Sequence, residues 1–149
     1  MPMKIRNPAI GEIEYEESAI ITFSEGMLGL PAYKRFLLLQ SENIAPFLRL
    51  QCVDEPTISF LLIDPAFLDP GYREYVAKAD ADQLYLQGSE ECVLFVVCKV
   101  ARGGEDITAN MVAPVAINHQ KMTGSQFILL DSPYNVRHSL AEVSERKEA

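Results

Sequence analysis

Short runs of apolar or alternating residues recur along the chain, roughly one every ten residues, with Gly, Pro, Asn, Asp or Ser between them. Runs of this length with a period of two predict β-strands, and their even spacing is typical of an all-β sandwich or barrel. We therefore expect an all-β, single-domain fold, an antiparallel β-barrel-like structure with at most short helices. The expected strands cover residues 3–6, 10–15, 19–23, 36–40, 47–53, 58–63, 72–76, 92–100, 107–112, 115–118 and 125–130.

The run over residues 92–100 is apolar on both faces apart from Lys99. A strand that is apolar on both faces is covered on both, so this strand is predicted to run through the middle of the sheet. Gly103 and Gly104 follow it, and paired glycines adopt the positive φ angles of a tight hairpin turn. The strands before and after this turn should be antiparallel neighbours.

A single helix is predicted, over residues 80–86. Asp80 is a good N-cap, Asp82 falls in the first turn, and Leu84 begins the apolar side. Beyond Leu140 the chain is too polar to hold itself in a core. We expect one domain over residues 1–140 and a flexible tail over 141–149, or a short helix there that forms only on a partner.

The composition is that of a soluble globular protein. Of 149 residues, 48% are hydrophobic and 23% are charged, which argues against a disordered chain. The longest apolar run is six residues, 92–97, against about 18 for a membrane span, and residues 1–15 lack the apolar segment of a signal peptide. We expect a cytoplasmic protein. Its three cysteines form no Cys-x-x-Cys pair, lie in apolar runs, and are expected to be buried free thiols: Cys52, Cys92 and Cys98.

The net charge of −8 is concentrated in the middle of the chain. Residues 51–100 contain three basic and nine acidic residues, a net −6, whereas residues 1–50 and 101–149 each sum to −1. This disfavours direct nucleic-acid binding, which needs clustered Lys and Arg, and suits a basic protein partner; the alternative is a solubilising surface. The predicted partner-facing acids are Asp64, Asp69, Glu74, Asp80 and Asp82.

No pattern of catalytic or metal-binding residues is present in the sequence. His119 and His138 have no ligand spacing around them and are expected to be surface or loop histidines. Gly26 and Gly29 are followed by neither a helix pattern nor a Lys, so they do not predict a phosphate-binding loop. We therefore expect no catalytic residue, no metal ion and no cofactor.

Six motifs marked by Gly, Pro, Asn or Gln follow one another along the chain: residues 23–31 (FSEGMLGLP), 46–52 (PFLRLQC), 60–65 (FLLIDP), 108–118 (TANMVAPVAIN), 126–129 (QFIL) and 134–137 (YNVR). Taken in this order they resemble the FliW family of flagellar assembly factors. The resemblance covers residues 3 to about 140. Cys52 is a departure, since the family usually has Ser after its Pro-Phe-x-x-Leu-Gln strand.

These motif residues also have structural roles that any β-domain would use. Glycines supply turn geometry, and proline stiffens a loop exit or interrupts a strand ladder. Asparagine at a strand end can hydrogen-bond loop backbone. We favour structural roles over direct partner contact for the motif residues Gly26, Gly29, Pro31, Phe47, Gln51, Asn110, Pro114, Asn118 and Gln126.

The resemblance implies a non-enzymatic protein, monomeric when free, that binds two protein partners. One is flagellin; the other is CsrA, a dimeric RNA-binding translational repressor. Flagellin and CsrA would compete, so that secretion of flagellin frees this protein to inhibit CsrA and flagellin synthesis follows demand. Two alternatives stay open. One is a small-molecule-binding or hydrolytic β-barrel whose pocket is framed by residues 26–31; the other is a flagellin chaperone with no regulatory role.

Overall fold

The computed structural model describes residues 3–79, 92–100, 106–130 and 132–140. The predicted helix at 80–86, the turn at Gly103 and Gly104 and the tail at 141–149 lie outside these ranges. Within them the elements are β1 (Met3–Asn7), β2 (Gly11–Tyr15), η1 (Glu17–Ala19), β3 (Ile21–Thr22), β4 (Arg35–Leu39), β5 (Leu48–Cys52), β6 (Ser59–Ile63), η2 (Pro65–Phe67), α1 (Tyr72–Ala79), β7 (Cys92–Val100), β8 (Ile107–Ala109), β9 (Val115–Asn118), β10 (Thr123–Gln126) and β11 (His138–Ser139).

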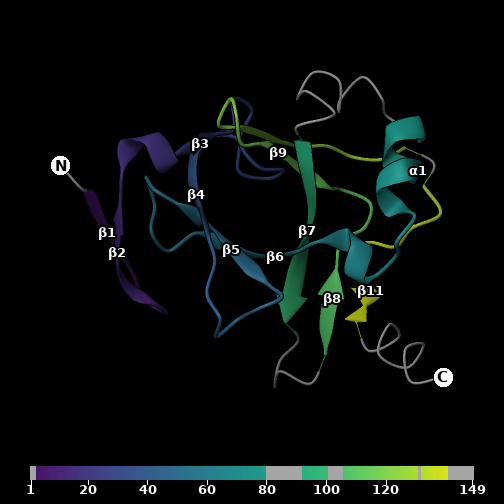
Figure 1. Ribbon diagram of the computed structural model, residues 1–149, viewed down its shortest axis with the longest axis horizontal. Helices are drawn as coiled ribbons and strands as arrows, with labels where there is room; N and C mark the ends of the chain where they lie inside the picture. Colours follow the sequence, from purple (N-terminus) through teal and green to yellow (C-terminus); the bar gives the residue numbers. More distant parts are fainter. Residues whose placement is uncertain (1–2, 80–91, 101–105, 131, 141–149) are drawn as a thin grey trace.

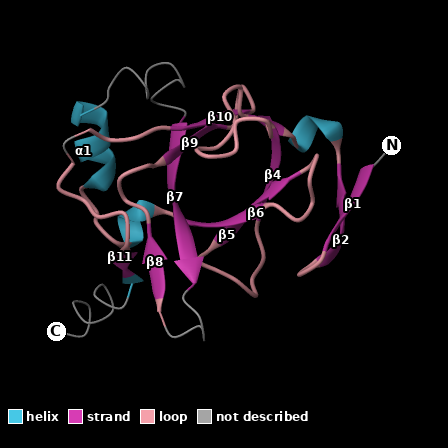
Figure 2. Ribbon diagram, turned by 180° about the vertical axis from the view of Figure 1, so that it is seen from behind, coloured by secondary structure: helices cyan, strands magenta, loops and turns pink. Residues whose placement is uncertain are grey.

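The strands close into a barrel, which confirms the predicted all-β, barrel-like class. The hydrogen-bonded order is β7-β6-β5-β4-β3-β10-β9, and β9 returns to pair with β7, which completes the ring seen in Figure 2. Closure removes the unpaired edges that an open sheet would present. Every pairing is antiparallel except that of β3 with β10, which is parallel.

β7 is the central strand, as its apolar run predicts. Its first half pairs with β9 and its last residues pair with β8, both on one side, while β6 pairs with residues 96–98 on the other. β7 and β8 are antiparallel neighbours, as expected. Between β8 and β9, residues 110–114 leave the ladder, so two separate strands share one side of β7.

The interior of the barrel is filled by large side chains. Phe23 and Phe36 are fully buried and meet edge to face with ring centroids 5.2 Å apart. Gly124 on β10 allows this packing, because a Cβ at that position would lie 2.4 Å from the Phe23 ring. The buried residues of this cluster are Ile21, Phe23, Met27, Phe36, Leu50, Cys52, Leu62, Phe95, Val115 and Ile117.

The predicted strand at residues 72–76 is wrong, because this segment begins the helix α1. Tyr72, Tyr75 and Val76 are three and four residues apart, so a helix brings them to one face, and Tyr72 and Val76 are fully buried. Strand alternation would instead place Glu74, which is exposed, on the same face as Tyr72 and Val76. The helix follows Asp69, whose side chain accepts a hydrogen bond from the Gly71 amide.

The helix α1 and the turn η2 cover the outer face of β7 (Figure 1). The side chains of Cys92, Leu94, Val96 and Cys98 point to this face and are buried in the largest apolar cluster. All three cysteines are buried and free, as predicted. Burial raises the pKa of the Cys98 thiol to about 12, because the thiolate would lose its hydration, and raises the pKa of Cys92 for the same reason.

The hairpin β1–β2 forms a sheet of its own and covers the outer face of β4 and β5. Tyr15, Leu37 and Val53 are the buried residues of this contact. A polar link fixes the hairpin to the barrel: the buried Asn7 Nδ2 donates to Gln51 Oε1 at 3.0 Å and to the Pro56 carbonyl at 2.9 Å. Gln51 is fully buried and donates to the Cys52 and Pro56 carbonyls.

Two further expectations differ from the structure. The predicted strand at 125–130 ends at Gln126, because Phe127 and Leu129 donate their amides to the loop carbonyls of Pro114 and Val112 rather than to a strand ladder. His138 does not lie in a loop: it begins β11, which pairs with β8, and it is half-buried, with no hydrogen-bond partner for its buried Nε2 among the residues that the structure describes. His119 is exposed, as expected.

Candidate functional site

Three of the five predicted partner-facing acids lie together at the η2–α1 end of the barrel. Asp64 precedes η2, Asp69 precedes α1, and Glu74 is exposed in the first turn of α1. Asp80 and Asp82 lie outside the described residues, immediately after α1 in the sequence. The structure therefore brings Asp64, Asp69 and Glu74 to one region.

Two of these carboxylates are already used within the fold. Asp64 Oδ1 accepts from the Ala66 amide at 2.9 Å and so caps η2. Asp69 Oδ1 accepts from the Gly71 amide, and its Oδ2 accepts from the Tyr134 hydroxyl at 2.6 Å. Glu74 is the member of this region whose charge is most available to a partner.

Tyrosines join α1 to the segment that leads into β11. The Tyr134 ring packs edge to face on Tyr72 and on Tyr75, with centroid distances of 4.9 and 5.1 Å. The Tyr72 hydroxyl donates to the Met111 carbonyl at 2.6 Å. Desolvation raises the pKa of both Tyr72 and Tyr134, and the hydrogen bond to Asp69 raises that of Tyr134 further.

A surface cavity of about 410 Å³ opens beside this contact. Its lining includes Asp69, Pro70, Tyr134 and His138. A second cavity of about 250 Å³ lies nearby in the fold, between η2, α1 and the start of β7, and is lined by Asp64, Arg73 and Val93 among others.

The motif residues at the start of the chain build one tight loop. Gly26 and Gly29 have φ values of 69° and 84°, which favour glycine. A Cβ on Gly26 would also lie 2.6 Å from the Leu30 carbonyl oxygen and 2.7 Å from the Cα of Pro31, whereas one on Gly29 would meet nothing. The loop closes on itself through the Leu30 amide, which donates to the Met27 carbonyl, and residues 26–31 line neither of the two cavities at the η2–α1 end.

Gln126 connects that loop to the segment between β8 and β9. Its Oε1 accepts from the Leu28 amide at 2.9 Å, and its Nε2 donates to the Ala113 carbonyl at 3.2 Å. Asn110 Oδ1 accepts from the amides of Val112 and Ala113. These contacts join three of the sequence motifs through backbone groups.

The remaining motif residues also make local contacts. Asn118 Oδ1 accepts from the amides of Gln120 and Lys121 in the β9–β10 turn. Pro114 ends the excursion of residues 110–114, and its carbonyl accepts from the Phe127 amide. Phe47 is partly buried against the cluster outside β7.

The described part of the chain holds no group of three or more His, Cys, Asp or Glu residues arranged to bind a metal ion. Among those same residues no helix is both long and apolar enough to span a membrane. The described side chains that fill the barrel interior are apolar and buried.

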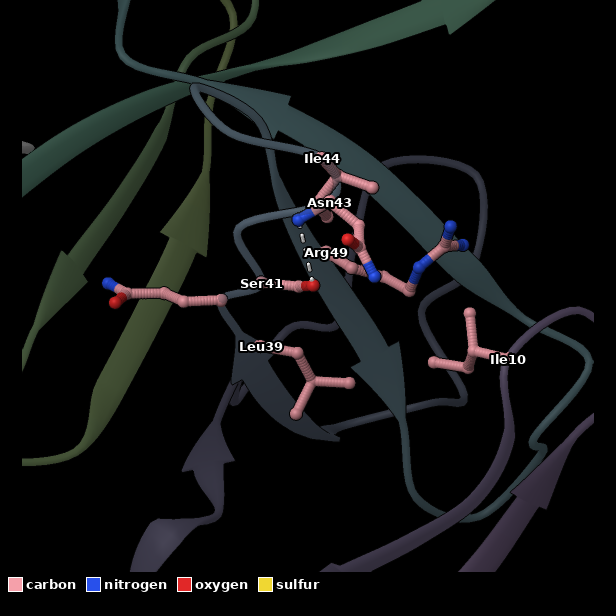
Figure 3. Close-up of a pocket in the computed structure, with 7 residues that line it drawn as sticks. Ile10, Leu39, Ser41, Asn43, Ile44 and Arg49 are labelled. Atoms are coloured by element: carbon pink, nitrogen blue, oxygen red, sulfur yellow. Dashed lines mark hydrogen bonds between the residues drawn. The ribbon is translucent and has the colours of Figure 1, made fainter.

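A third cavity, of about 450 Å³, lies at the other end of the molecule, beside the hairpin β1–β2, and sequence reasoning missed it. Figure 3 shows Ile10 from the β1–β2 turn, Ile44 from the β4–β5 loop, and Arg49 from β5 converging there. We call this cavity the Arg49 groove; it is lined by Ile10, Leu39, Gln40, Ser41, Asn43, Ile44 and Arg49. Arg49 lies in the motif at residues 46–52, but the groove as a whole could not be predicted from it, because the lining residues come from three separate segments.

Comparison with known proteins gives a consistent result over nearly the whole chain. The FliW protein family model matches residues 4–140. The chain is 34% identical to the flagellar assembly factor FliW of Geotalea uraniireducens, with 99% of this chain and 90% of that protein covered. It is 37% identical to the flagellar assembly factor FliW of Geobacillus kaustophilus, with 93% and 95% covered.

A solved structure agrees. The crystal structure of a flagellar assembly factor FliW superposes with a TM-score of 0.76 at 35% identity, covering 91% of this chain and 95% of that one. Both the sequence and the barrel are therefore shared with these proteins. The chain belongs to the FliW family of flagellar assembly factors.

Proposed function

We propose that this protein is a cytoplasmic, non-enzymatic regulator that binds flagellin and, when free of flagellin, binds and inhibits the translational repressor CsrA. The observation that carries this proposal is the match to flagellar assembly factors over residues 4–140. Competition between two partners needs no reacting group. Flagellin export and CsrA inhibition would be coupled by mass action, because the fraction of this protein free to bind CsrA rises as flagellin leaves the cell.

The filled barrel supports a protein-binding role over a small-molecule or hydrolytic one. A ligand-binding barrel needs an enclosed cavity with convergent polar groups. Here the interior holds apolar side chains such as Phe23, Phe36 and Leu50. The loop at residues 26–31, which such a barrel would use to frame its pocket, closes instead on its own backbone.

We place the CsrA-facing surface at the η2–α1 end, on Glu74 with Asp64, Asp69, Asp80 and Asp82. Its support is the net −6 of residues 51–100 and the gathering of three of these acids in one region. An RNA-binding protein carries a basic surface, so an acidic surface would steer the encounter. Flagellin, in contrast, is expected to be recognised mainly through apolar or β-edge contacts.

Size-exclusion chromatography tests the two-partner scheme directly. The protein is run with the cognate flagellin, with the cognate CsrA, and with both. We expect a complex in each pairwise run, and displacement of CsrA when flagellin is added. A complex with flagellin alone would leave a chaperone without a regulatory role, and no complex with either would refute the proposal.

A charge-reversal variant locates the CsrA surface. Glu74, Asp80 and Asp82 are changed together to Lys, leaving Asp64 and Asp69 in place because they cap η2 and hold Tyr134. Association with CsrA should slow at low salt, with less change in dissociation, and flagellin binding should change less. Each acid alone should contribute only about 0–1 kcal/mol.

The matched control changes the same number of charges elsewhere. Glu16, Glu17 and Glu25 are exposed and lie outside the η2–α1 region, so their triple Lys variant has the same net charge. If both variants slow CsrA association equally, only the total charge matters. If neither does while both remain folded, the interface lies elsewhere.

A further inference from the structure

The outer face of β5 is buried under the hairpin β1–β2 at the end of the strand and is partly exposed nearer its start. Val53 just beyond the strand and Gln51 within it lie under the hairpin β1–β2 and are buried. Arg49 is the next residue on the same face, since successive residues of a strand alternate between faces. It is only partly buried, because the hairpin cover ends there and the Arg49 groove opens.

The two polar side chains on this face are satisfied very differently. Gln51 donates to the backbone carbonyls of Cys52, Pro56 and Ile58 and accepts from Asn7. Arg49 has five donor positions, yet its one hydrogen bond to the described part of the chain is from Nη1 to Ser59 Oγ, at 3.0 Å. It forms no ion pair with any residue that the structure describes.

The lack of a carboxylate partner is notable in a chain of net charge −8. By contrast, the other Arg on the outer face of this part of the barrel, Arg35 of β4, holds the Asp54 carboxylate with both Nε and Nη2. Glu42 lies in the β4–β5 loop beside the groove, but it is exposed and makes no ion pair with Arg49. Arg49 is the one charged residue among the seven that line the groove.

Apolar side chains flank this cation. Leu39 is the cross-strand partner of Arg49. In the view of Figure 3 the Arg49 side chain extends between Ile44 and Ile10, and Ile10 is 43% exposed. The groove thus offers one guanidinium, with aliphatic surface on two sides and the polar Ser41 and Asn43 at its rim.

We propose that the Arg49 groove is a binding site for a peptide segment of a protein partner in which an acidic side chain is flanked by aliphatic residues. The planar guanidinium fits a carboxylate with two parallel hydrogen bonds, and the aliphatic neighbours would cover Ile10 and Ile44. The volume of the Arg49 groove, about 450 Å³, is also within the usual range of ligand-binding sites. This site does not depend on the identity of the partners proposed above.

A side-chain carboxylate fits the groove better than a chain terminus. Terminal carboxylates are captured by groups of free backbone amides. In the β4–β5 loop the amides of Ile44 and Ala45 already donate to the Ser41 carbonyl, and that of Asn43 donates to Ser41 Oγ. These three amides are therefore not available to a terminus, whereas among the described residues Arg49 donates only to Ser59.

Nuclear magnetic resonance titration tests the site on the full chain. The probe is acetyl-Leu-Glu-Ile-amide, and its matched control is acetyl-Leu-Gln-Ile-amide, which has nearly the same shape without the charge. We expect the Glu peptide to shift the resonances of Ile10, Ile44 and Arg49, and to bind about tenfold more tightly than the Gln peptide, since charged hydrogen bonds are the stronger class. Equal binding of the two peptides, or shifts elsewhere on the surface, would overturn the proposal.

Variants of the protein sharpen the result. Arg49→Gln should remove the preference for the Glu peptide, and Arg49→Lys should retain part of it, because it keeps the charge without the planar fork. Arg6→Gln, on the exposed side of β1, makes the same charge change outside the groove and should retain the preference. Loss of the preference in Arg6→Gln as well would show a general charge effect and overturn the site. The two-peptide comparison on wild-type protein decides the question even if Arg49→Gln does not fold.

Discussion

The two covers on the outside of the barrel differ in how they are held. At the η2–α1 end, thirteen buried residues form one apolar cluster, and three tyrosine rings lock α1 to the chain that leads into β11. At the hairpin end the buried apolar residues, among those that the structure describes, are Tyr15, Leu37 and Val53, and the buried polar pair Asn7–Gln51 supplies the rest of the attachment. Because burial of apolar area is the larger stabilising effect, the α1 cover should be the more stable of the two.

The comparison also bears on function. A cover held by few apolar contacts opens more readily, and binding surfaces are often drawn from the less stable parts of a fold. The Arg49 groove lies where the hairpin cover ends, and the proposed acidic surface lies on the more firmly packed α1 end. The molecule therefore presents a cationic groove at one end and acidic side chains at the other.

The largest expected effect comes from removing one buried tyrosine at each end. Tyr72→Ala should lower the free energy of unfolding by about 3–5 kcal/mol, as for other large aromatic side chains in a core. Tyr15→Ala, in the smaller cluster, should cost only about 1.5–3 kcal/mol. Urea unfolding of both variants measures the difference. Equal losses would mean that the two covers are equally stable.

A polar deletion should act locally at the hairpin. Asn7→Ala removes the donor to Gln51 and Pro56 and the acceptor for the amides of Ala9 and Ile10, at a cost of about 1–3 kcal/mol. Hydrogen exchange should accelerate in β1 and β2 far more than in α1. Asn110→Ala is the control, since it also loses two amide hydrogen bonds but lies away from the hairpin. Uniform acceleration over both ends in Asn7→Ala would contradict local attachment.

High pH should weaken the α1 end first. The pKa of Tyr72 is raised by desolvation, so the folded state keeps its proton where the unfolded chain loses it. The contribution of Tyr72 to the free energy of unfolding is complete below pH 10, the ordinary tyrosine pKa. It is lost as pH rises above 10, by about 1.4 kcal/mol for the first pH unit. Unfolding measured at pH 9 and pH 11 checks this. Tyr72→Phe should show a smaller loss between the two, and an identical loss would assign the effect to other groups.

The smallest effect is expected at the exposed ion pair of Arg35 and Asp54, on the hairpin side. The hydrogen bond that Arg35 donates to the Asp54 carboxylate holds the pKa of Asp54 below its usual range. The ion pair therefore stabilises the folded protein above about pH 4, and this stabilisation is lost as pH falls below that value. Arg35→Gln should cost no more than about 1 kcal/mol at pH 7, because both side chains are over 40% exposed. A loss much above this value, or one that persists at pH 2, would show that Arg35 acts through packing.

The motif residues show how far local reasoning extends. Gly26 and Gly29 were expected to form a turn, and each has a positive φ. Asn110 and Asn118 were expected to bind loop backbone, and both do. Gln126 illustrates the limit: its two contacts are to residues 98 and 13 positions away, which its own surroundings in the sequence do not reveal.

The sequence by itself determined the strand-rich class, the central position of β7 and the buried state of the three thiols, because periodicity and apolar runs record which residues avoid water. Residues 72–76 were expected to form a strand, but the spacing of Tyr72, Tyr75 and Val76 is helical, since strand alternation would place Glu74 on the buried face. Only the tertiary structure decided what covers each buried face, how β9 closes the ring on β7, and why Gln51 is satisfied while Arg49 is not. Those outcomes depend on contacts between distant segments, such as Asn7 with Gln51, and a local pattern shows that a residue is buried but not which segment buries it.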